Sequence, residues 1–219
     1  MKALWEYPVT FSFTVFIFLL YPIVLIFVPH TYIYKYFYAV PGYFNPLNWL
    51  LSIFFHNSPE HLLGNIIVLF VVGRVVEEKV GPLRWILFFF LAGFFSVIAD
   101  SIIRAFVFHD YAPVVGASGA IAGLIAIAAL LSPLHIHIMG KEIFFPVFAL
   151  LWFLAYSDVK KLHSDDHVAH WAHLAGFLSC FLTAYFLDAK QKEEWKNGFV
   201  INIVFFTLTM VLLYLLKNR

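Results

Sequence analysis

The sequence predicts an all-α polytopic membrane protein, and three observations carry that prediction: the composition, the length of the apolar runs and the residues that separate them. Of the 219 residues, 63% are hydrophobic, only 12% are charged, and 27 are phenylalanine. Soluble domains carry about twice that share of charged residues. Several apolar runs reach the roughly 20 helical residues that cross about 30 Å of hydrocarbon. We therefore expect a multi-pass integral membrane protein that contacts the lipid bilayer along most of its length.

Seven membrane spans are expected, separated by prolines, glycines and clustered charges. Their approximate ranges are 9–28, 59–77, 83–103, 116–131, 143–157, 167–187 and 198–216. The segment from Pro29 to Pro59 is too long for a turn and is rich in aromatic residues, which favours a position at the membrane–water interface. No soluble domain or internal repeat is evident, so residues 1–219 are predicted to form a single transmembrane domain.

Charge and cysteine content argue against a nucleic-acid-binding protein and against a fold held by intrachain disulfides. The 14 Lys and Arg residues are balanced by 13 Asp and Glu residues, so nothing indicates a nucleic-acid partner. Cys180 is the only cysteine, which rules out an intrachain disulfide. Function is therefore to be sought in the polar residues within the apolar spans.

Polar side chains near the start of three spans give the first indication of function. His61, Ser118 and His173 lie near the N-terminal ends of the second, fourth and sixth spans. Those spans cross the membrane in the same direction, so the three side chains are expected at similar depth on one side. Polar and ionisable groups at such a depth are unfavourable, and by default they indicate a functional site.

Small residues predict which of these spans pack together. The face of the fourth span that carries Ser118 is made of small residues, with two glycines beside it: Ala122, Ala126, Ala129, Gly119 and Gly123. The face of the sixth span that carries His173 has the same character: Ala169, Gly176, Cys180 and Ala184. Such faces let membrane helices approach closely, which would bring Ser118 and His173 within hydrogen-bond reach. The histidine would then serve as general base toward the serine hydroxyl.

Acyl transfer also requires hydrogen-bond donors for the oxyanion of the tetrahedral intermediate. His61 and Asn65 are four residues apart, so they share one face of the second span. The backbone N–H of Ser118 lies at a helix start, where it is unpaired and positively polarised. These three groups are expected to form an oxyanion hole, which indicates a serine protease built within the bilayer.

Together, these residues resemble the rhomboid family of intramembrane serine proteases. The similar motifs are His56-x4-His61-x3-Asn65, Gly73-x3-Glu77 with Gly81, Gly116-Ala-Ser118-Gly119 and Ala172-His173-x2-Gly176. The resemblance covers about residues 45–187. It implies a rhomboid-like six-helix core over about 9–187 and one extra C-terminal helix over about 198–216.

The resemblance also implies roles for individual residues. The positions matching Ser118 and His173 form a catalytic dyad without an acidic third member, and those matching His61 and Asn65 complete the oxyanion hole with the serine amide. The position matching Glu77 helps to anchor the loop between the first two spans. Rhomboids are hydrolases that cleave transmembrane segments of other proteins without a metal or nucleotide cofactor. By this resemblance the chain is an intramembrane endopeptidase, located in the cell membrane if its host is prokaryotic.

Three positions depart from the family pattern. Rhomboids often have Trp-Arg in the first loop, whereas residues 47–50 of this chain contain no arginine. Many members have an aromatic residue four positions after the serine, where this chain has Ala122, so Trp171 or a residue of the second span is expected to orient His173. The second glycine of the sixth span is replaced by Cys180, which is small enough to keep the helices close.

Two other interpretations compete with a serine protease. A membrane metal transporter or a metalloprotease would use a cluster of histidines and aspartates: His163, His167, His170, His173, Asp158, Asp165 and Asp166, with His135 and His137 as a separate pair. That interpretation leaves Ser118, His61 and Asn65 without a role. The other is an inactive rhomboid-like protein that binds membrane clients. Such relatives typically lack the serine or the histidine, and this chain has both.

A transmembrane substrate must reach Ser118 between helices, because a sealed bundle offers no other route. The short fifth span is expected to be the movable wall. It presents aromatic residues that pack against lipid or the first loop without polar pairing: Phe144, Phe145, Phe148, Trp152 and Phe153. The alternative is that these side chains are ordinary lipid-facing residues.

Overall fold

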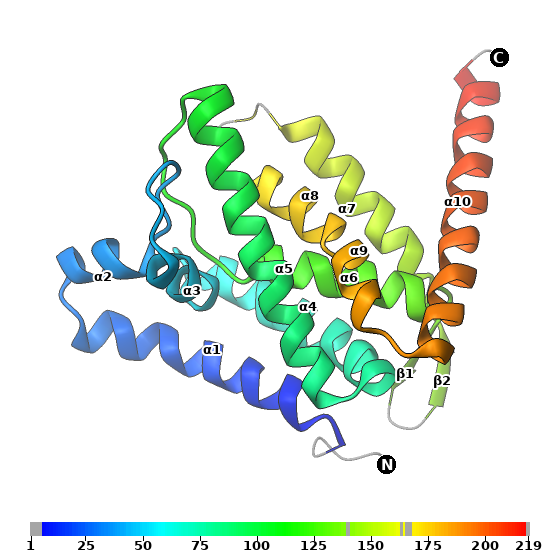
Figure 1. The fold of residues 1–219 in the computed structure, drawn as a ribbon, viewed down its shortest axis with the longest axis horizontal. Coiled ribbons are helices and arrows are strands. Elements are labelled where there is room, and N and C mark those ends of the chain that lie inside the picture. The colour runs from blue at the N-terminus through cyan, green and yellow to red at the C-terminus, as the bar shows by residue number, and fades with distance from the viewer. Residues whose placement is uncertain (1–5, 139–140, 163, 165–167, 218–219) are drawn as a thin grey trace.

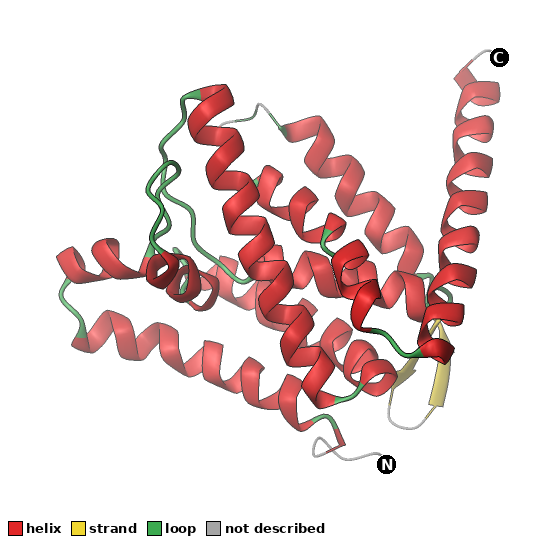
Figure 2. Cartoon of the chain, viewed as in Figure 1, coloured by secondary structure: helices red, strands yellow, loops and turns green. Residues whose placement is uncertain are grey.

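Helices make up nearly all of the regular structure in the computed structural model, which describes residues 6–138, 141–162, 164 and 168–217 (Figure 1). Two short strands, β1 (His135–Ile138) and β2 (Lys141–Phe144), form an antiparallel hairpin (Figure 2). The helices are α1 (Pro8–Phe27), α2 (His30–Phe37), α3 (Pro46–Phe54), α4 (Pro59–Val80), α5 (Pro82–Ile103), α6 (Ser118–Leu131), α7 (Val147–Lys161), α8 (His170–Leu178), α9 (Cys180–Thr183) and α10 (Ala189–Lys217). This architecture confirms the predicted all-α polytopic membrane protein.

Four helical stretches in the described part of the chain are long and apolar enough to cross a membrane. They are α1, α4, α10, and α5 together with the π-helical turn Arg104–Phe108 that extends it. α6 is also apolar but has only 14 residues. Every residue from Gly119 to Leu131 is buried, because α6 lies at the centre of the bundle. Neighbouring helices rather than lipid therefore surround α6, and it need not match the full bilayer thickness.

Prolines and caps define where several helices begin and end. α1, α3, α4 and α5 each have proline in the first turn, where its missing N–H removes no helical bond. The hydroxyl of Ser58 accepts the backbone N–H of His61 at 3.1 Å and so caps α4. Gly81 ends α4 with a φ of +79°, a conformation that residues with a Cβ rarely adopt. This single residue joins α4 to α5.

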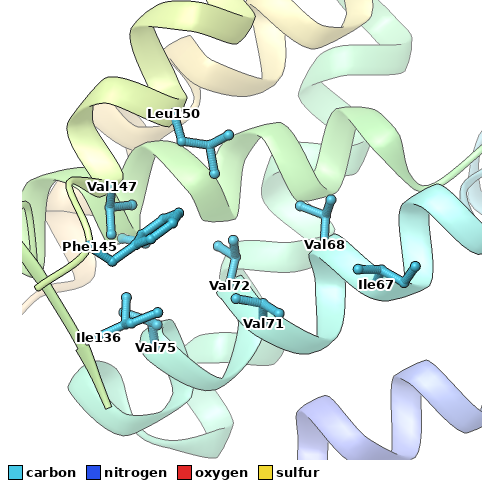
Figure 3. A pocket seen from close by; sticks show the side chains of 10 residues that line it. Ile67, Val68, Val71, Val72, Val75, Ile136, Phe145, Val147 and Leu150 are labelled. Carbon is cyan, nitrogen blue, oxygen red and sulfur yellow. The ribbon is translucent and has the colours of Figure 1, made fainter. Parts of the chain in front are cut away.

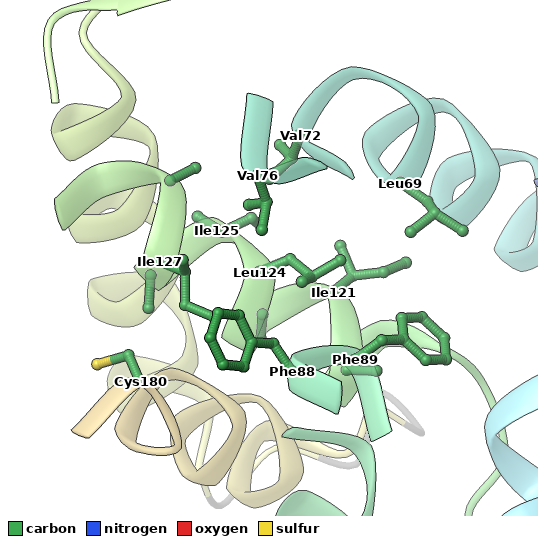
Figure 4. Close-up of a cluster of buried hydrophobic side chains, with 14 of the residues drawn as sticks. Leu69, Val72, Val76, Phe88, Phe89, Ile121, Leu124, Ile125, Ile127 and Cys180 are labelled. Carbon is green, nitrogen blue, oxygen red and sulfur yellow. The ribbon is translucent and has the colours of Figure 1, made fainter. Parts of the chain in front are cut away.

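Glycines allow α6 to approach α5 and α8 closely. A Cβ on Gly119 would collide with the Ser96 side chain, and one on Gly176 would collide with the carbonyl oxygen of Gly119. A Cβ on Gly123 would lie 3.0 Å from the carbonyl oxygen of Gly176. The small-residue faces of the fourth and sixth spans therefore meet as predicted, with Gly119 and Gly123 inside the contact. Large buried side chains fill the adjoining core (Figure 4): Phe88, Phe89, Leu124 and Ile127.

The segment between α1 and α4 contains two short helices, α2 and α3, and is tied down by backbone and side-chain bonds. Ala39 and Val114 form an isolated antiparallel bridge with N–H···O distances of 3.0 and 2.8 Å. The amide of Asn48 donates to the carbonyl oxygens of Lys35 and Tyr38, at 2.6 and 3.2 Å. Asn48 is buried, so these bonds fasten α3 to the residues before it. The loop is thus anchored without the arginine that rhomboids often have there.

Three predicted boundaries are wrong, each for a local reason. The fifth span begins at Val147, because the β hairpin takes up the residues expected to start it. The sixth span is not one continuous helix, since it breaks between α8 and α9 at Ser179, whose hydroxyl donates to the carbonyl oxygen of Gly176 at 2.6 Å. The last helix begins at Ala189, because the charged residues expected to form a loop instead form its first turns.

α10 docks on the end of α6 that lies farthest from Ser118. A Cβ on Gly198 would collide with the backbone of Leu130. The side chain of Asn202 donates to the carbonyl oxygen of Ala129 at 2.9 Å. Beyond this contact most described side chains of α10 are exposed, as expected for a helix whose remaining surface faces lipid.

Aromatic stacking joins α7 to α10. Phe148 stacks on Phe205 and Trp152 stacks on Phe206, each pair with ring centroids 4.5 Å apart. The prediction that Phe148 and Trp152 pack against lipid or the first loop is therefore wrong, because both contact α10. The other three aromatic residues expected in the movable wall are all exposed, and two of them precede α7: Phe144 and Phe145, with Phe153 on α7 itself.

Candidate active site

Ser118 is the first residue of α6, and Gly116 shapes the loop that leads into it. Gly116 has a φ of +128°, which only glycine adopts without strain. Its N–H donates to the carbonyl oxygen of Ser52 at 2.8 Å and ties the loop to α3. The first bond of α6 runs from the N–H of Ile121 to the carbonyl of Ala117, so the N–H of Ser118 has no partner within the helix.

His61 and Asn65 lie against this loop, one helical turn apart on α4. A Cβ on Gly116 would be 2.6 Å from the ring of His61 and 3.6 Å from Nδ2 of Asn65. Glycine is therefore required for its size as well as for its φ. The structure thus places two of the predicted oxyanion-hole residues beside the loop that ends at the third, Ser118.

The hydrogen bonds of these side chains determine which atoms remain for a substrate. Nδ2 of Asn65 donates to Nε2 of His56 at 2.8 Å, which leaves Asn65 a second amide hydrogen. Nδ1 of His61 lies 2.8 Å from Oδ1 of Asn57. In this arrangement neutral His61 donates through Nδ1 and carries a lone pair at Nε2. Nε2 becomes an oxyanion donor when the ring gains a proton, or when the Asn57 amide turns so that its NH2 group faces Nδ1.

His56 contacts both Asn65 and the loop that precedes Ser118. It precedes the membrane-spanning α4 and is fully buried. Its Nε2 accepts from Asn65 and lies 3.5 Å from the N–H of Ala117. Burial, together with the nearby charge of His61, lowers the pKa of His56 to about 3, so the ring is neutral and Nε2 remains an acceptor. His56 thus connects α4 to the residue before Ser118.

His173 lies on α8 next to the contact with α6. It follows Ala172 and precedes Gly176 by one turn, and both of these residues lie against Gly119. No hydrogen bond joins Ser118 to His173, both of which belong to the described residues. Catalytic hydrogen bonds are often long before substrate binds, so the close approach of the two helices is the relevant geometry here.

Asp158 on α7 holds the ring of His173. Nδ1 of His173 lies 3.0 Å from Oδ1 of Asp158, and Nδ1 of His170 lies 2.6 Å from the same oxygen. Trp171, which was expected to orient His173, instead packs beside Phe108 with ring centroids 5.6 Å apart. Sequence reasoning placed Asp158 only in a metal cluster, because it is 15 residues from His173 and on another helix.

Comparison with known proteins agrees with this fold. The family model of the Rhomboid domain matches residues 44–190. The chain belongs to the rhomboid family.

Three curated relatives of this rhomboid come from Arabidopsis thaliana. RHOMBOID-like protein 1 is 32% identical over 147 residues, which are 66% of this chain and 35% of the relative. RHOMBOID-like protein 4 is 29% identical over 152 residues, covering 68% and 35% of the two chains. Rhomboid-like protein 11, chloroplastic, is 28% identical over 164 residues, covering 68% and 57%. The rhomboid described here thus matches from about a third to somewhat over half of the length of these relatives.

Asp158, His170 and His173 also form a group that fits a metal ion. Their ligand atoms lie within 4.8 Å of one another, and two histidines with one carboxylate are ligands that zinc accepts. The separate pair His135 and His137 belongs to β1. The other members of the predicted cluster lie outside the part of the chain that the structure describes: His163, Asp165, Asp166 and His167. A metal here would bind Nδ1 of His173 in place of its hydrogen.

Two further motif residues of this rhomboid serve helix packing. The buried carboxylate of Glu77 accepts the N–H groups of Val9 and Thr10 at 3.0 and 2.8 Å, where a negative charge stabilises the start of α1. The prediction that Glu77 anchors the loop between the first two spans is therefore wrong, because that loop follows the other end of α1. Nε1 of Trp85 donates to the carbonyl oxygen of Gly73 at 2.8 Å and links α5 to α4.

An apolar cavity of about 160 Å³ lies between α4 and α7 (Figure 3). Val72 of α4 and Leu150 of α7 face each other across it, and no polar residue lines it. Ala128 of α6 borders it, ten residues or about 15 Å along the helix from Ser118. The cavity therefore does not contain the candidate nucleophile. It marks an incompletely filled contact between α4 and α7.

Proposed function

We propose that this rhomboid is an intramembrane serine endopeptidase that cleaves transmembrane segments of other membrane proteins. The observation that carries the proposal is the position of Ser118 between two helices. The loop before it runs over His61 and Asn65, while α8, which bears His173, packs against the residue after it. This position supports a mechanism in which the α4 side of the serine supplies oxyanion donors and the α8 side supplies the base.

In this mechanism Ser118 is the nucleophile and His173 is the general base. Nε2 of His173 takes the hydroxyl proton as Oγ of Ser118 bonds to the carbonyl carbon of the scissile peptide, whose oxygen becomes an oxyanion. The C–N bond then breaks, and His173 gives the proton to the leaving amine. Water, deprotonated by the same nitrogen, hydrolyses the acyl-enzyme and restores Ser118.

Three groups stabilise the oxyanion. The N–H of Ser118 is polarised by the helix that it starts. Asn65 contributes the amide hydrogen that His56 does not use. His61 contributes through Nε2 when that nitrogen carries a proton. This chemistry calls for no cofactor.

Substrate reaches Ser118 laterally, between α4 and α7. The cavity between these helices leaves room for the Val147 end of α7 to move, since no polar residue lines it. The other end of α7 is held to α8 by the bonds of Asp158. The stacking of Phe148 and Trp152 on α10 restrains that movement. In a prokaryotic host the enzyme would act in the cell membrane.

Cleavage in proteoliposomes tests the proposal. The wild-type protein is reconstituted with a protein that has one transmembrane segment, and new termini within that segment are identified by mass spectrometry. Ser118→Ala should produce none, while Ser132→Ala, a serine at the other end of α6, should cleave normally. Cleavage that persists in Ser118→Ala would refute the assignment.

A metal-dependent function is the second candidate, because Asp158, His170 and His173 bring three ligand atoms together. It predicts that EDTA abolishes activity and that zinc restores it. The serine mechanism predicts unchanged activity in EDTA. An inactive, client-binding rhomboid would bind transmembrane segments but would give no Ser118-dependent cleavage.

A further inference from the structure

The hydrogen bonds around Asp158 define the protonation of the proposed base. Nδ1 of His170 and Nδ1 of His173 both face Oδ1 of Asp158, at 2.6 and 3.0 Å. An ionised carboxylate can only accept hydrogen bonds, so each Nδ1 carries a hydrogen. A neutral imidazole has one N–H, which leaves the lone pair of His173 on Nε2. Nε2 is the nitrogen that the proposed mechanism uses.

The burial of this group shows that the arrangement is specific. Asp158 and His170 are each 6% exposed, and a carboxylate in such surroundings is unfavourable unless it is hydrogen-bonded. The two imidazoles supply those bonds. The side chain of His173 is 20% exposed, so its other edge remains open. Asp158 comes from α7 and both rings come from α8, so the contact also joins the two helices.

We propose that Asp158 is a positioning residue, which fixes His173 in the Nδ1–H tautomer and holds the direction of its ring. The inference rests on the proposed function, because it explains how the general base of that reaction is oriented. Asp158 thereby takes the place of the aromatic residue that Ala122 does not provide. The contact also limits the movement of α7, the expected movable wall. α7 must be packed against α8 when the peptide bond is attacked, because only then does Asp158 reach His173.

Two other titratable groups lie near His173 without bonding to it. His61 on α4 and Asp100 on α5 are within electrostatic range of the ring. Asp100 is fully buried, and one of its oxygens lies 3.5 Å from Arg104. Asp100→Asn is therefore a matched control, since it removes a buried carboxylate that makes no hydrogen bond to the base.

Kinetics in proteoliposomes provide the first test. Asp158→Ala should lower kcat about 100-fold and change KM less than about twofold, because the orienting acid of a serine protease acts on the chemical step. Asp158→Asn supplies an amide whose NH2 group can face Nδ1 and favour the Nε2–H tautomer, so it should lose at least as much activity as Asp158→Ala, and Asp158→Glu should recover most of the activity lost in Asp158→Ala. Asp100→Asn should stay within about threefold of the wild type. A kcat within about threefold of the wild type in Asp158→Ala would overturn the proposal.

The ring tautomer provides a second test that does not depend on proteolysis. Histidine-labelled protein is studied by ¹⁵N and ¹³C NMR, and the signals of His173 are assigned by their absence in His173→Gln. The wild type should show the Nδ1–H tautomer, and Asp158→Ala should populate the Nε2–H tautomer. An Nε2–H tautomer in the wild type would overturn the proposal even if the enzyme is a serine protease. If Asp158→Ala does not fold, the wild-type spectrum and the kinetics of Asp158→Asn decide the question.

Discussion

Two pairs of histidines flank Ser118, and they differ in the partners that hold them. His56 and His61, on the α4 side, are bonded to side-chain amides. His170 and His173, on the α8 side, are bonded to one carboxylate. A carboxylate stabilises an imidazole that gains a proton during the reaction more strongly than a neutral amide does. The comparison supports the proposal that His61, on the α4 side, stabilises the oxyanion and that His173, on the α8 side, transfers the proton.

The largest effect should come from the proton-transfer side. Ser118→Ala or His173→Ala should lower kcat for a transmembrane substrate by at least about 10³-fold, because each removes a group that makes or breaks a bond. Thermal stability in detergent should change little. His170 bonds the same carboxylate as His173 but takes no part in the proposed chemistry. His170→Ala should therefore lower kcat less than about tenfold. Equal losses in His170→Ala and His173→Ala would move the base to His170.

Substitutions on the α4 side, where the histidines are bonded to amides, should lower kcat less than those of Ser118 and His173. Asn65→Ala and His61→Ala each remove one proposed oxyanion donor, which is worth about 10²–10³ in kcat in other enzymes, and sharing among three donors reduces that. We therefore expect losses of about 10- to 100-fold in kcat with a smaller change in KM. A variant that raises KM alone would assign its residue to substrate binding.

The next prediction concerns the access of a transmembrane substrate to Ser118 and not the chemical step. Phe148→Ala and Trp152→Ala remove the stacking of α7 on α10 and should raise kcat/KM for a transmembrane substrate about two- to fivefold, since gating steps often limit such enzymes. Phe205→Ala, from the α10 side, should do the same. A small water-soluble ester should gain less because it enters from the aqueous side.

Phe153→Ala is the matched control for these variants, because Phe153 is exposed on the same helix. Equal gains for both substrates, or losses that follow lowered thermal stability, would leave the aromatic pairs with a purely structural role.

The smallest effect is a pH dependence of stability that originates at His56. Its folded-state pKa of about 3 lies below the unfolded value, about 6.5, so the unfolded chain binds more protons between these pH values. Stability should therefore fall as the pH is lowered from about 6.5 toward 3. His56→Gln keeps an acceptor for Asn65 and should weaken this dependence. Melting temperatures in detergent at pH 7, 5 and 4 make the comparison, and identical slopes would contradict it.

The features that the sequence predicts are those determined by short spacings. The spans follow from the apolar runs, and the shared face of His61 and Asn65 follows from their four-residue spacing. The contact of α6 with α8 follows from small residues such as Gly119 and Gly176.

The features that the sequence does not predict depend on helices that meet in space. Asp158 reaches His173 from another helix, and Glu77 bonds the distant start of α1, so no local pattern links either pair. The start of α10 was missed because charged residues at a membrane surface are compatible with helix as well as with loop. Phe148 stacks on α10 for a similar reason: an aromatic side chain suits a helix neighbour as well as lipid.

The site of covalent labelling by a fluorophosphonate tests the central claim most directly. The reagent reacts with a serine only when a neighbouring base activates it. Mass spectrometry should find one adduct, on Ser118, and should find it lost in His173→Ala and strongly reduced in Asp158→Ala. An adduct on another serine, or equal labelling of Ser118 in the wild type and in His173→Ala, would contradict the account.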